Sequence, residues 1–299
     1  MNKEQLKERN QKIVEEYINT PNHLKNLTKL AEKFGLKQSR SVSKILKDAG
    51  VVIYNTAQHT CIDETVFDVI DTEEKAYWLG FMYADGCIYS KEYRMELSLQ
   101  GSDVEHLQKF SKFLKSTKSD LVKIYRNYKQ GNYDRCRVSV RSKHLWESLN
   151  NKGCVPNKSL ILTFPDNIPD NLIKHFIRGY IDGDGCLCTS NPYKIELNVL
   201  GTLDFLTGVV KNLPLKRDYP IFKVKNKNYY TLNLWCSTAI DIIKFLYENA
   251  TIYLDRKYEK YLEVCRLKEE SFKLLETNIG ESCDVNTEIT EETKESSAS

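Results

Sequence analysis

Alternating hydrophobic and polar residues mark candidate strands in this chain of 299 residues. In residues 94–100 every second residue is hydrophobic, namely Met95, Leu97 and Leu99. The residues between them are Arg94, Glu96, Ser98 and Gln100. A period of two is the pattern of a strand with one buried and one exposed face, and it predicts a half-buried strand here.

Two further segments show the same alternation with basic residues on the polar side. Cys136, Val138 and Val140 alternate with Arg135, Arg137, Ser139 and Arg141. Later in the chain, Phe222 and Val224 alternate with Lys223, Lys225 and Lys227. We therefore expect two sheets, each with an exposed basic face.

A face of arginine, lysine and tyrosine suits a DNA duplex, because phosphates attract the charge and base edges accept forked donors. The alternative is an antiparallel sheet whose polar face only keeps the protein in solution. Recurrence of the positive residues in both segments favours DNA contact. The predicted DNA-contacting residues are Arg94, Lys123, Tyr125, Arg135, Arg137, Arg141, Lys194, Lys223, Lys225 and Lys227.

The chain contains one internal duplication, in which residues 76–160 match residues 175–260. AYWLGFMYADGCIYS reappears as HFIRGYIDGDGCLCTS, and RMELSLQG reappears as KIELNVLG. Each copy predicts a helix that ends at an Asp-Gly pair, two strands, a helix, two strands and a closing helix. The Asp-Gly pairs, Asp85-Gly86 and Asp184-Gly185, occupy equivalent places.

Small residues recur one turn apart on both helices that end at these pairs. Gly80 and Ala84 lie four residues apart in the first, and Gly179 and Gly183 in the second. Small side chains on one stripe allow two helices to approach almost backbone to backbone.

If the two helices are parallel, Asp85 and Asp184 meet at their C-terminal ends, and each following glycine can take the left-handed cap conformation. Two carboxylates at the negative ends of two helix dipoles favour a hard divalent cation such as Mg²⁺. The alternative for a single Asp-Gly pair is an ordinary helix stop.

Both segments resemble the signature helix of the LAGLIDADG homing endonucleases, and the resemblance covers residues 65–268. It implies an α+β fold of two pseudo-symmetric α-β-β-α-β-β-α halves, whose antiparallel sheets form a saddle over double-stranded DNA. It also implies that the last acidic residue of each motif, Asp85 and Asp184, is catalytic and binds Mg²⁺, for which Mn²⁺ can substitute.

The same resemblance suggests three further catalytic residues. A polar residue after the second strand matches Gln100, whereas the second copy has Leu200, which implies an asymmetric site. Basic residues that assist the scissile phosphate resemble Lys158 and Lys257, although either lysine could be a solvated surface residue. Asp182 stands where the first copy has Tyr83, and we expect a structural role for it.

Residues 1–60 precede the duplication and predict a small helix-turn-helix domain. Leu27, Leu30, Ala31 and Phe34 form one apolar stripe, Gly35 allows the turn, and Val42, Ile45 and Leu46 form the second stripe. This leaves Gln38, Ser39, Arg40, Ser43 and Lys44 free for a major groove. The alternative is a helical hairpin that only supports the larger part of the chain.

The net charge of +3 conceals a basic body. Residues 271–299 hold seven acidic residues against two lysines, so this segment carries −5 and residues 1–270 carry +8. Such an imbalance favours a polyanionic partner, although it also fits simple solubility.

Nine cysteines are scattered without a CxxC pair, and only Cys186 and Cys188 are close in sequence. This spacing does not favour a zinc site and suits reduced thiols. No apolar run approaches a membrane span, and the first residues do not look like a secretion signal. We expect an intracellular protein, in a cytoplasm, an organelle or a phage-infected cell.

We therefore expect residues 1–60 to be a helix-turn-helix region, 61–170 and 171–268 the two halves, and 269–299 an acidic disordered tail. The expected function is sequence-specific, Mg²⁺-dependent cleavage of double-stranded DNA to staggered ends, by a monomer with internal pseudo-two-fold symmetry. The alternatives are a non-cleaving nucleic-acid binder of the same fold, such as an RNA maturase or a transcription regulator. A helix-turn-helix regulator with an unrelated sensory domain leaves the duplication unexplained.

Overall fold

The computed structural model describes residues 3–20, 25–51, 53, 62–117, 121–127, 133–191 and 194–267. Two compact units divide the chain, Met1–Gly183 and Asp184–Ser299. The predicted acidic tail, residues 269–299, lies outside the described residues. Among the helices in the described ranges, none combines the length and the apolar character that a membrane crossing requires.

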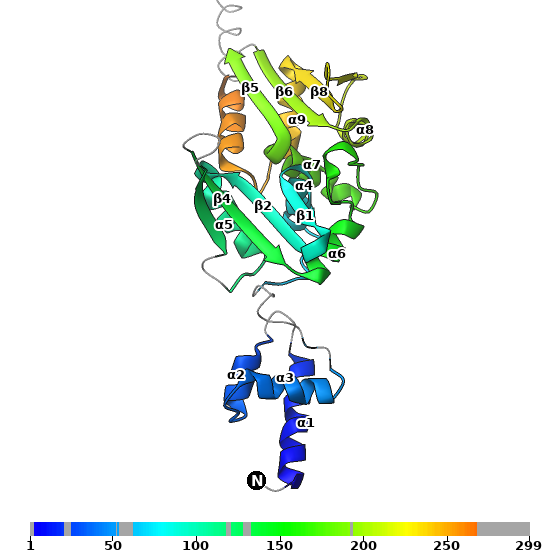
Figure 1. Cartoon of the computed structure of the whole chain (residues 1–299). Coiled ribbons are helices and arrows are strands. Elements are labelled where there is room, and N and C mark those ends of the chain that lie inside the picture. The colour runs from blue at the N-terminus through cyan, green and yellow to red at the C-terminus, as the bar shows by residue number, and fades with distance from the viewer. Residues whose placement is uncertain are drawn as a thin grey trace, which may run out of the picture. The chain divides into compact units, whose positions relative to one another are not determined.

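The first copy of the duplication forms a four-stranded antiparallel sheet, here called sheet A, with the strand order β1-β2-β4-β3. Its elements, drawn in cyan to green in Figure 1, follow one another in the order helix, two strands, helix, two strands, helix. They are α4 (Glu73–Ala84), β1 (Gly86–Tyr89), β2 (Arg94–Gln100), α5 (Val104–Phe113), β3 (Val122–Asn127), β4 (Tyr133–Arg141) and α6 (Lys143–Asn151).

The second copy forms sheet B, with the equivalent order β5-β6-β8-β7. Its elements are α7 (Asp170–Asp184), β5 (Gly185–Asn191), β6 (Lys194–Gly201), α8 (Leu203–Asn212), β7 (Ile221–Lys223), β8 (Tyr230–Trp235) and α9 (Cys236–Tyr247). A further helix covers residues 255–267. The predicted α+β class and the α-β-β-α-β-β-α order are therefore confirmed in both copies.

Helices α4 and α7 pack against each other almost backbone to backbone, as the small-residue stripes predict. A Cβ atom on Gly80 would overlap the carbonyl group of Phe176, and one on Gly179 would overlap that of Tyr77. One on Gly183 would overlap the Cβ atom of Ala84. These contacts advance along both helices in the same direction, so α4 and α7 run parallel and their last turns lie side by side.

The strands of sheet A have the predicted faces. Met95, Leu97 and Leu99 are buried on β2, as are Cys136, Val138 and Val140 on β4. Helix α5 covers this face and contributes Leu107 and Phe110 to the core, because its hydrophobic residues also lie on one side.

The prediction for residues 222–227 is wrong. Strand β7 ends at Lys223, and Lys225 and Lys227 belong to the turn between β7 and β8, where the amide of Lys227 donates to the carbonyl of Val224. Phe222 is 48% exposed instead of buried. Ile221 pairs with the buried Leu232, so Ile221 and Lys223 take the core side of the strand and Phe222 takes the open side.

The hairpins that follow the two Asp-Gly pairs also differ. Gly86 lies opposite Leu97, eleven residues on, whereas Gly185 lies opposite Val199, fourteen residues on. The residue three positions past each partner is Gln100 in sheet A and Thr202 in sheet B. Thr202 is the N-cap of α8, and its side chain accepts a hydrogen bond from the amide of Phe205. By strand register, therefore, the counterpart of Gln100 in the second copy is the polar Thr202. The sequence alignment had put Leu200 in that place.

Three N-terminal helices form a separate small core, and these are α1 (Lys3–Asn19), α2 (Leu27–Lys33) and α3 (Ser39–Asp48). Leu30 and Ala31 of α2 meet Val42 and Leu46 of α3, as predicted. Helix α1, which precedes the two predicted apolar stripes, adds Ile13 and Tyr17 to this core. Gly35 has φ +65°, the left-handed conformation that the turn between α2 and α3 requires.

Candidate metal and nucleic-acid site

Asp85 follows the last residue of α4 and begins the turn into β1. Its amide donates to the carbonyl of Phe81 at 3.0 Å, and its φ and ψ of −90° and −11° continue the helical course. The prediction of a left-handed glycine cap is wrong, since Gly86 and Gly185 are the first residues of β1 and β5 and neither has a positive φ. Gly86 is instead required by space, because a Cβ there would lie 2.6 Å from the carbonyl oxygen of Met82.

The carboxylate of Asp85 points at the last turn of α7. Its Oδ2 atom lies 3.2 Å from the position that a Cβ on Gly183 would take. The smallness of Gly183 therefore leaves room for this carboxylate beside the residue that precedes Asp184. Asp85 is half-buried and Asp184 is exposed.

No cluster of three or more His, Cys, Asp or Glu side chains suited to a metal ion occurs among the described residues. A cation bound by Asp85 at the end of α4 would therefore take further oxygen ligands, such as water and a bound phosphate. Carboxylate, water and phosphate oxygens are the ligands that Mg²⁺ prefers.

Lys158 and Lys257 make the same contact in the two copies. Lys158, in the short 3₁₀ helix η4 (Lys158–Leu160), donates from Nζ to the carbonyls of Ala84 at 2.9 Å and Gly86 at 2.6 Å. Lys257, in the first turn of the helix at residues 255–267, donates from Nζ to the carbonyl of Gly185. Both side chains are buried, with 7% and 6% exposure, so neither is a solvated surface residue.

This placement has an electrostatic consequence for the Asp-Gly ends. A lysine charge beside the last carbonyls of a helix offsets the partial negative charge that accumulates there. It also lowers the repulsion that a neighbouring carboxylate would meet. The contact with α4 shows that Lys158 holds the end of the helix, and any part that either lysine takes in catalysis remains a prediction.

A buried thiol, Cys154, lies near Lys158, and a buried phenol, Tyr83, lies near that thiol. The hydroxyl of Tyr83 donates to the carbonyl of Lys152, and the thiol of Cys154 donates to that of Met82 at 3.5 Å. Burial raises the pKa of Cys154 to about 12, so this cysteine remains a neutral thiol and is not a nucleophile.

A buried ion pair joins α4 to α7. Arg178 is fully buried and donates to Glu73 at 2.6 Å and to Nδ1 of His175 at 2.9 Å. Burial first, and then the charge of Arg178, lower the pKa of His175 to about 4, so its ring is neutral and can accept this bond. Sequence reasoning missed this pair, although His175 and Arg178 stand one turn apart within a buried helix.

Asp182 has the structural role expected for it. It is fully buried, and its Oδ2 accepts a hydrogen bond from the hydroxyl of Tyr77 at 2.7 Å. The same hydroxyl lies 3.1 Å from Nε2 of His106. This chain of polar groups belongs to the helix contact and gives Asp182 no access to solvent.

The open face of sheet A carries the predicted basic residues, and two glutamates hold several of them in place. Glu96 pairs with Arg94 at 2.5 Å and lies 3.6 Å from Arg137, while Glu92 pairs with Arg141 at 2.6 Å. The ring of Tyr125 lies under the Arg137 guanidinium, 5.1 Å from it. Lys123 and Tyr125 share this face, because they lie opposite Arg137 and Arg135.

Gln100 ends β2 on the same face and is exposed. It lines an open hollow together with Gly101, Ser102, Ile124, Asp134 and Arg135. The hollow therefore combines one amide, one carboxylate and one guanidinium at the edge of sheet A.

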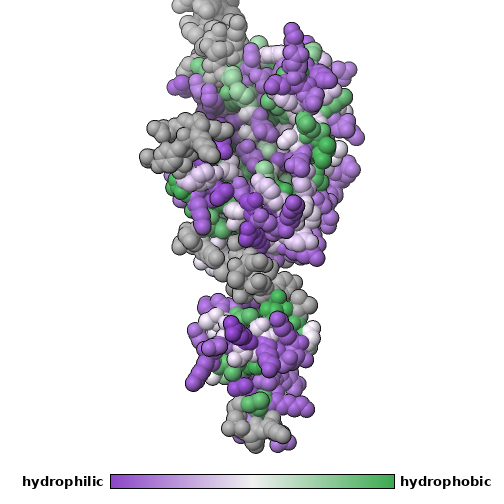
Figure 2. All heavy atoms as spheres, in the orientation of Figure 1, coloured by the Kyte–Doolittle hydropathy of each residue, from purple (hydrophilic) through white to green (hydrophobic). Residues whose placement is uncertain are grey.

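Among the described side chains, the open face of sheet B is not basic, which differs from the expectation for the second copy. Lys223 lies on the core side of β7, Lys225 and Lys227 lie in the exposed turn, and the side chain of Lys194 is outside the described residues. Among the described side chains, this face carries Cys186, Cys188, Glu196, Asn198, Leu200, Phe222, Thr231, Asn233 and Trp235. Figure 2 shows a surface on which hydrophilic side chains predominate and hydrophobic ones are scattered among them.

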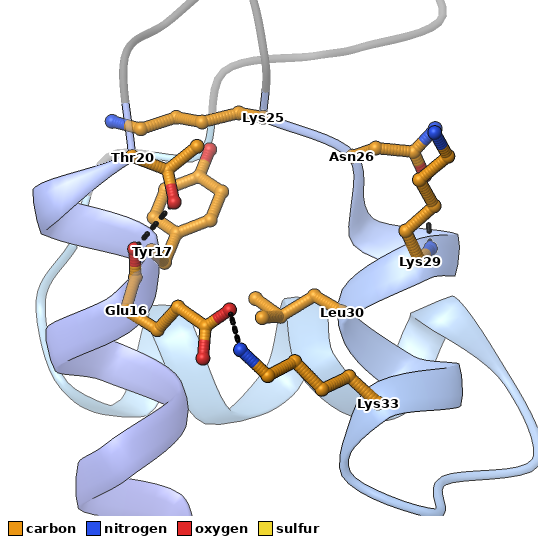
Figure 3. A pocket seen from close by; sticks show the side chains of 8 residues that line it. All are labelled: Glu16, Tyr17, Thr20, Lys25, Asn26, Lys29, Leu30 and Lys33. Atoms are coloured by element: carbon orange, nitrogen blue, oxygen red, sulfur yellow. Dashed lines mark hydrogen bonds and ion pairs between the residues drawn. The ribbon is translucent and has the colours of Figure 1, made fainter.

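The N-terminal helices present the residues that the helix-turn-helix pattern selects. Gln38, Arg40 and Lys44 are exposed, and Ser39 is half-buried at the first position of α3. A separate hollow between α1 and α2 is lined by three lysines and Glu16 (Figure 3). There Lys25 lies 4.6 Å over the ring of Tyr17, and Lys33 pairs with Glu16 at 2.7 Å.

No protein-family model and no curated protein sequence matches the chain. Solved structures do match. Meganuclease I-SmaMI bound to uncleavable DNA has a TM-score of 0.45 at 13% identity, over 67% of this chain and 89% of that one. The LAGLIDADG meganuclease I-AabMI bound to uncleaved DNA has a TM-score of 0.41 at 14% identity, over 65% and 91%.

The I-LtrWI LAGLIDADG homing endonuclease bound to target DNA has a TM-score of 0.44 at 14% identity, over 67% and 92%. At these scores the likeness says nothing about the chemistry of the site, which rests on the residues of this chain. Over about two thirds of its length, the chain is thus similar to solved structures of LAGLIDADG homing endonucleases.

Proposed function

We propose that this protein is a sequence-specific endonuclease that cleaves double-stranded DNA, with Asp85 and Asp184 as the carboxylates that hold Mg²⁺. The observation that carries the proposal is the position of the Asp85 carboxylate against Gly183, the residue before Asp184. A buried lysine at each Asp-Gly end adds to it, because the same arrangement occurs once in each copy.

In this mechanism Asp85 and Asp184 would hold the cation, whose charge would relieve the repulsion between carboxylates. Mg²⁺, for which Mn²⁺ would substitute, supplies Lewis acidity for the hydrolysis of a phosphodiester bond. Lys158 and Lys257 keep each Asp-Gly turn in place and contribute positive potential beside the scissile phosphates. Gln100, exposed at the end of β2, would orient a polar group of the substrate in the first half.

The duplication accounts for the expected products. One aspartate and one lysine in each copy would serve one strand of the duplex, so a single chain cuts both strands and leaves staggered ends. The N-terminal helices extend the contact, with Gln38, Ser39, Arg40 and Lys44 of the α3 region reaching the major groove. Arg40→Ala with Lys44→Ala is expected to weaken DNA binding and leave the cleavage chemistry intact.

The test uses a plasmid that carries the DNA sequence joined across the insertion point of this gene. The wild-type chain is expected to cut it with Mg²⁺ and not with EDTA. Asp85→Asn and Asp184→Asn should each reduce cleavage by about a thousand-fold and still bind the DNA. Asp204→Asn, an exposed acid in the first turn of α8, is the matched control and should cut normally.

Two results would contradict the proposal. If both asparagine variants cut at the wild-type rate, the cation is held elsewhere. If the wild-type chain binds the DNA tightly but never cuts it with Mg²⁺ or Mn²⁺, the protein is a binder of this fold, such as a maturase or a transcription regulator.

A further inference from the structure

The open face of sheet B consists of three rows of side chains that cross the strands. In the first row Leu200, Thr231 and Phe222 lie opposite one another. The second row is Cys186, Asn198 and Asn233, and the third is Cys188, Glu196 and Trp235. Leu200, Phe222 and Trp235 are each more than 40% exposed.

The equivalent rows of sheet A have a different chemistry. By register from Gly86 and Gly185, the row of sheet A that is equivalent to Leu200, Thr231 and Phe222 is Ser98, Arg137 and Lys123. The row equivalent to Cys186, Asn198 and Asn233 is Cys87, Glu96 and Ser139. Gln100, Arg135 and Tyr125 form a further row of sheet A. Arg94 and Arg141 are opposite each other further along. The strand order of the two sheets is the same, so side chains at equivalent register can be compared directly.

These side chains select different features of a duplex. Phosphates attract the arginines and lysine of sheet A, whereas the described face of sheet B has one carboxylate and no cation to offer them. The described side chains of sheet B are amides, a hydroxyl and apolar groups, which suit contacts with base edges. An asparagine amide pairs with N6 and N7 of adenine, apolar groups contact the methyl of thymine, and a guanidinium pairs with O6 and N7 of guanine.

We propose that the two sheets read half-sites of different composition: sheet A a half-site containing guanine, and sheet B a half-site rich in A·T pairs. Asn198 and Asn233 contact adenines, and Leu200, Thr231 and Phe222 contact thymine methyls. Arg135 and Arg137 contact guanines and the nearby phosphates. This assignment rests on the proposed function, because it needs the sheets to face DNA.

The experiment is selection of bound duplexes from a randomised library by the full chain carrying Asp85→Asn and Asp184→Asn, so that bound DNA is not cut. The enriched site is expected to be A·T-rich in one half and to contain guanine in the other. Asn198→Ala and Asn233→Ala, each added to this chain, should lower the base preference about ten-fold or more at one A·T position. Arg135→Ala and Arg137→Ala should do so at guanine positions.

The dependence of DNA affinity on salt concentration is a second measurement. It would not change if these residues had only a structural role. Each arginine replacement is expected to reduce the slope of log affinity against log salt by about one, and each asparagine replacement to leave it unchanged. Asn150→Ala on α6, outside the strands of both sheets, serves as the control and should change neither the slope nor the selected site.

The outcomes separate this inference from the proposed function. Selection of a site whose halves have the same composition, or asparagine variants that select the wild-type site, would overturn the assignment of sheet B and leave DNA binding established. If no duplex is enriched at all, the proposed function itself fails.

Discussion

The two Asp-Gly ends are nearly alike, while the two open sheet faces are not. At each end a buried lysine donates to the carbonyl of the glycine that follows the aspartate. On the sheets, Arg94, Arg137 and Arg141 of the first copy correspond by register to Glu196, Thr231 and Trp235 of the second. Both regions come from the same duplication, so they have diverged to different extents.

The difference follows from what each region has to do. Under the proposed function, a reaction repeated on two antiparallel DNA strands would need the same groups twice, and the close packing of α4 and α7 leaves little freedom at the helix ends. The exposed residues of a sheet face, among those the structure describes, can change without disturbing the core. Four sets of substitutions test whether the helix ends and the sheet faces differ in this way.

The largest effect is expected at the glycine stripe. Gly80→Val places a branched side chain against the backbone of Phe176, which cannot move without separating α4 from α7. We expect the free energy of unfolding to fall by about 4 kcal/mol, measured by chemical denaturation. Glu74→Val, at an exposed position of the same helix, should cost far less. Equal losses in the two variants would mean that helix propensity and not close packing limits this position.

The next effect is expected at the ion pair, where the two helices differ. Position 178 is arginine, whereas Leu79 stands at the equivalent place on α4. Arg178→Met leaves Glu73 without its main partner and His175 without its donor, and should cost about 3 kcal/mol of stability. The double variant Arg178→Met with Glu73→Gln should recover part of this loss. A single variant as stable as the wild type would show that the pair contributes nothing beyond packing.

The lysines should contribute similar amounts in both copies. Lys158→Met and Lys257→Met keep the aliphatic length and remove the ammonium group, which leaves buried carbonyls without a donor. Each is expected to lower the unfolding free energy by about 2 kcal/mol, with Lys211→Met on the exposed side of α8 as the control. A large loss in one copy and none in the other would refute the equivalence of the two ends.

The smallest effect is expected on the sheet faces. Arg137→Ala in sheet A and Asn233→Ala in sheet B remove side chains that point to solvent. Both should change the unfolding free energy by less than about 0.5 kcal/mol in thermal or chemical denaturation. A loss comparable with that of the lysine variants would indicate that the open faces are part of the stable core.

Much of the fold could be predicted from the chain, because its repeated elements have strong periodicity. The order of elements, the buried face of sheet A and the close helix contact at Gly80 and Gly179 were all expected, and the structure confirms them. The prediction for residues 222–227 failed because hydrophobic alternation in a short edge segment does not distinguish a strand from a turn. There Phe222 and Val224 offered a hydrophobic pattern without a core to bury it.

The site was less predictable, because its key contacts join residues far apart in sequence. Asp85 and Asp184 could be selected from the motif, but no spacing rule places Lys158 on the carbonyl of Gly86. The partners of the arginines were also missed, since Glu92 lies outside the alternating pattern and meets Arg141 only when the sheet forms. Likewise, the buried Arg178 looked like an ordinary charged helix residue until its partner on α4 was known.

The stripes of glycine and alanine along α4 and α7 bear on how a chain with the proposed function could acquire a new DNA target. The close spacing of α4 and α7 depends on glycine and alanine residues. A change of DNA target would not require any of these residues to change. Variation in the open strands can therefore accumulate while the reacting groups remain in place. A library for retargeting should leave residues 80, 84, 179 and 183 constant and vary the solvent-facing positions of β2, β4, β6 and β8.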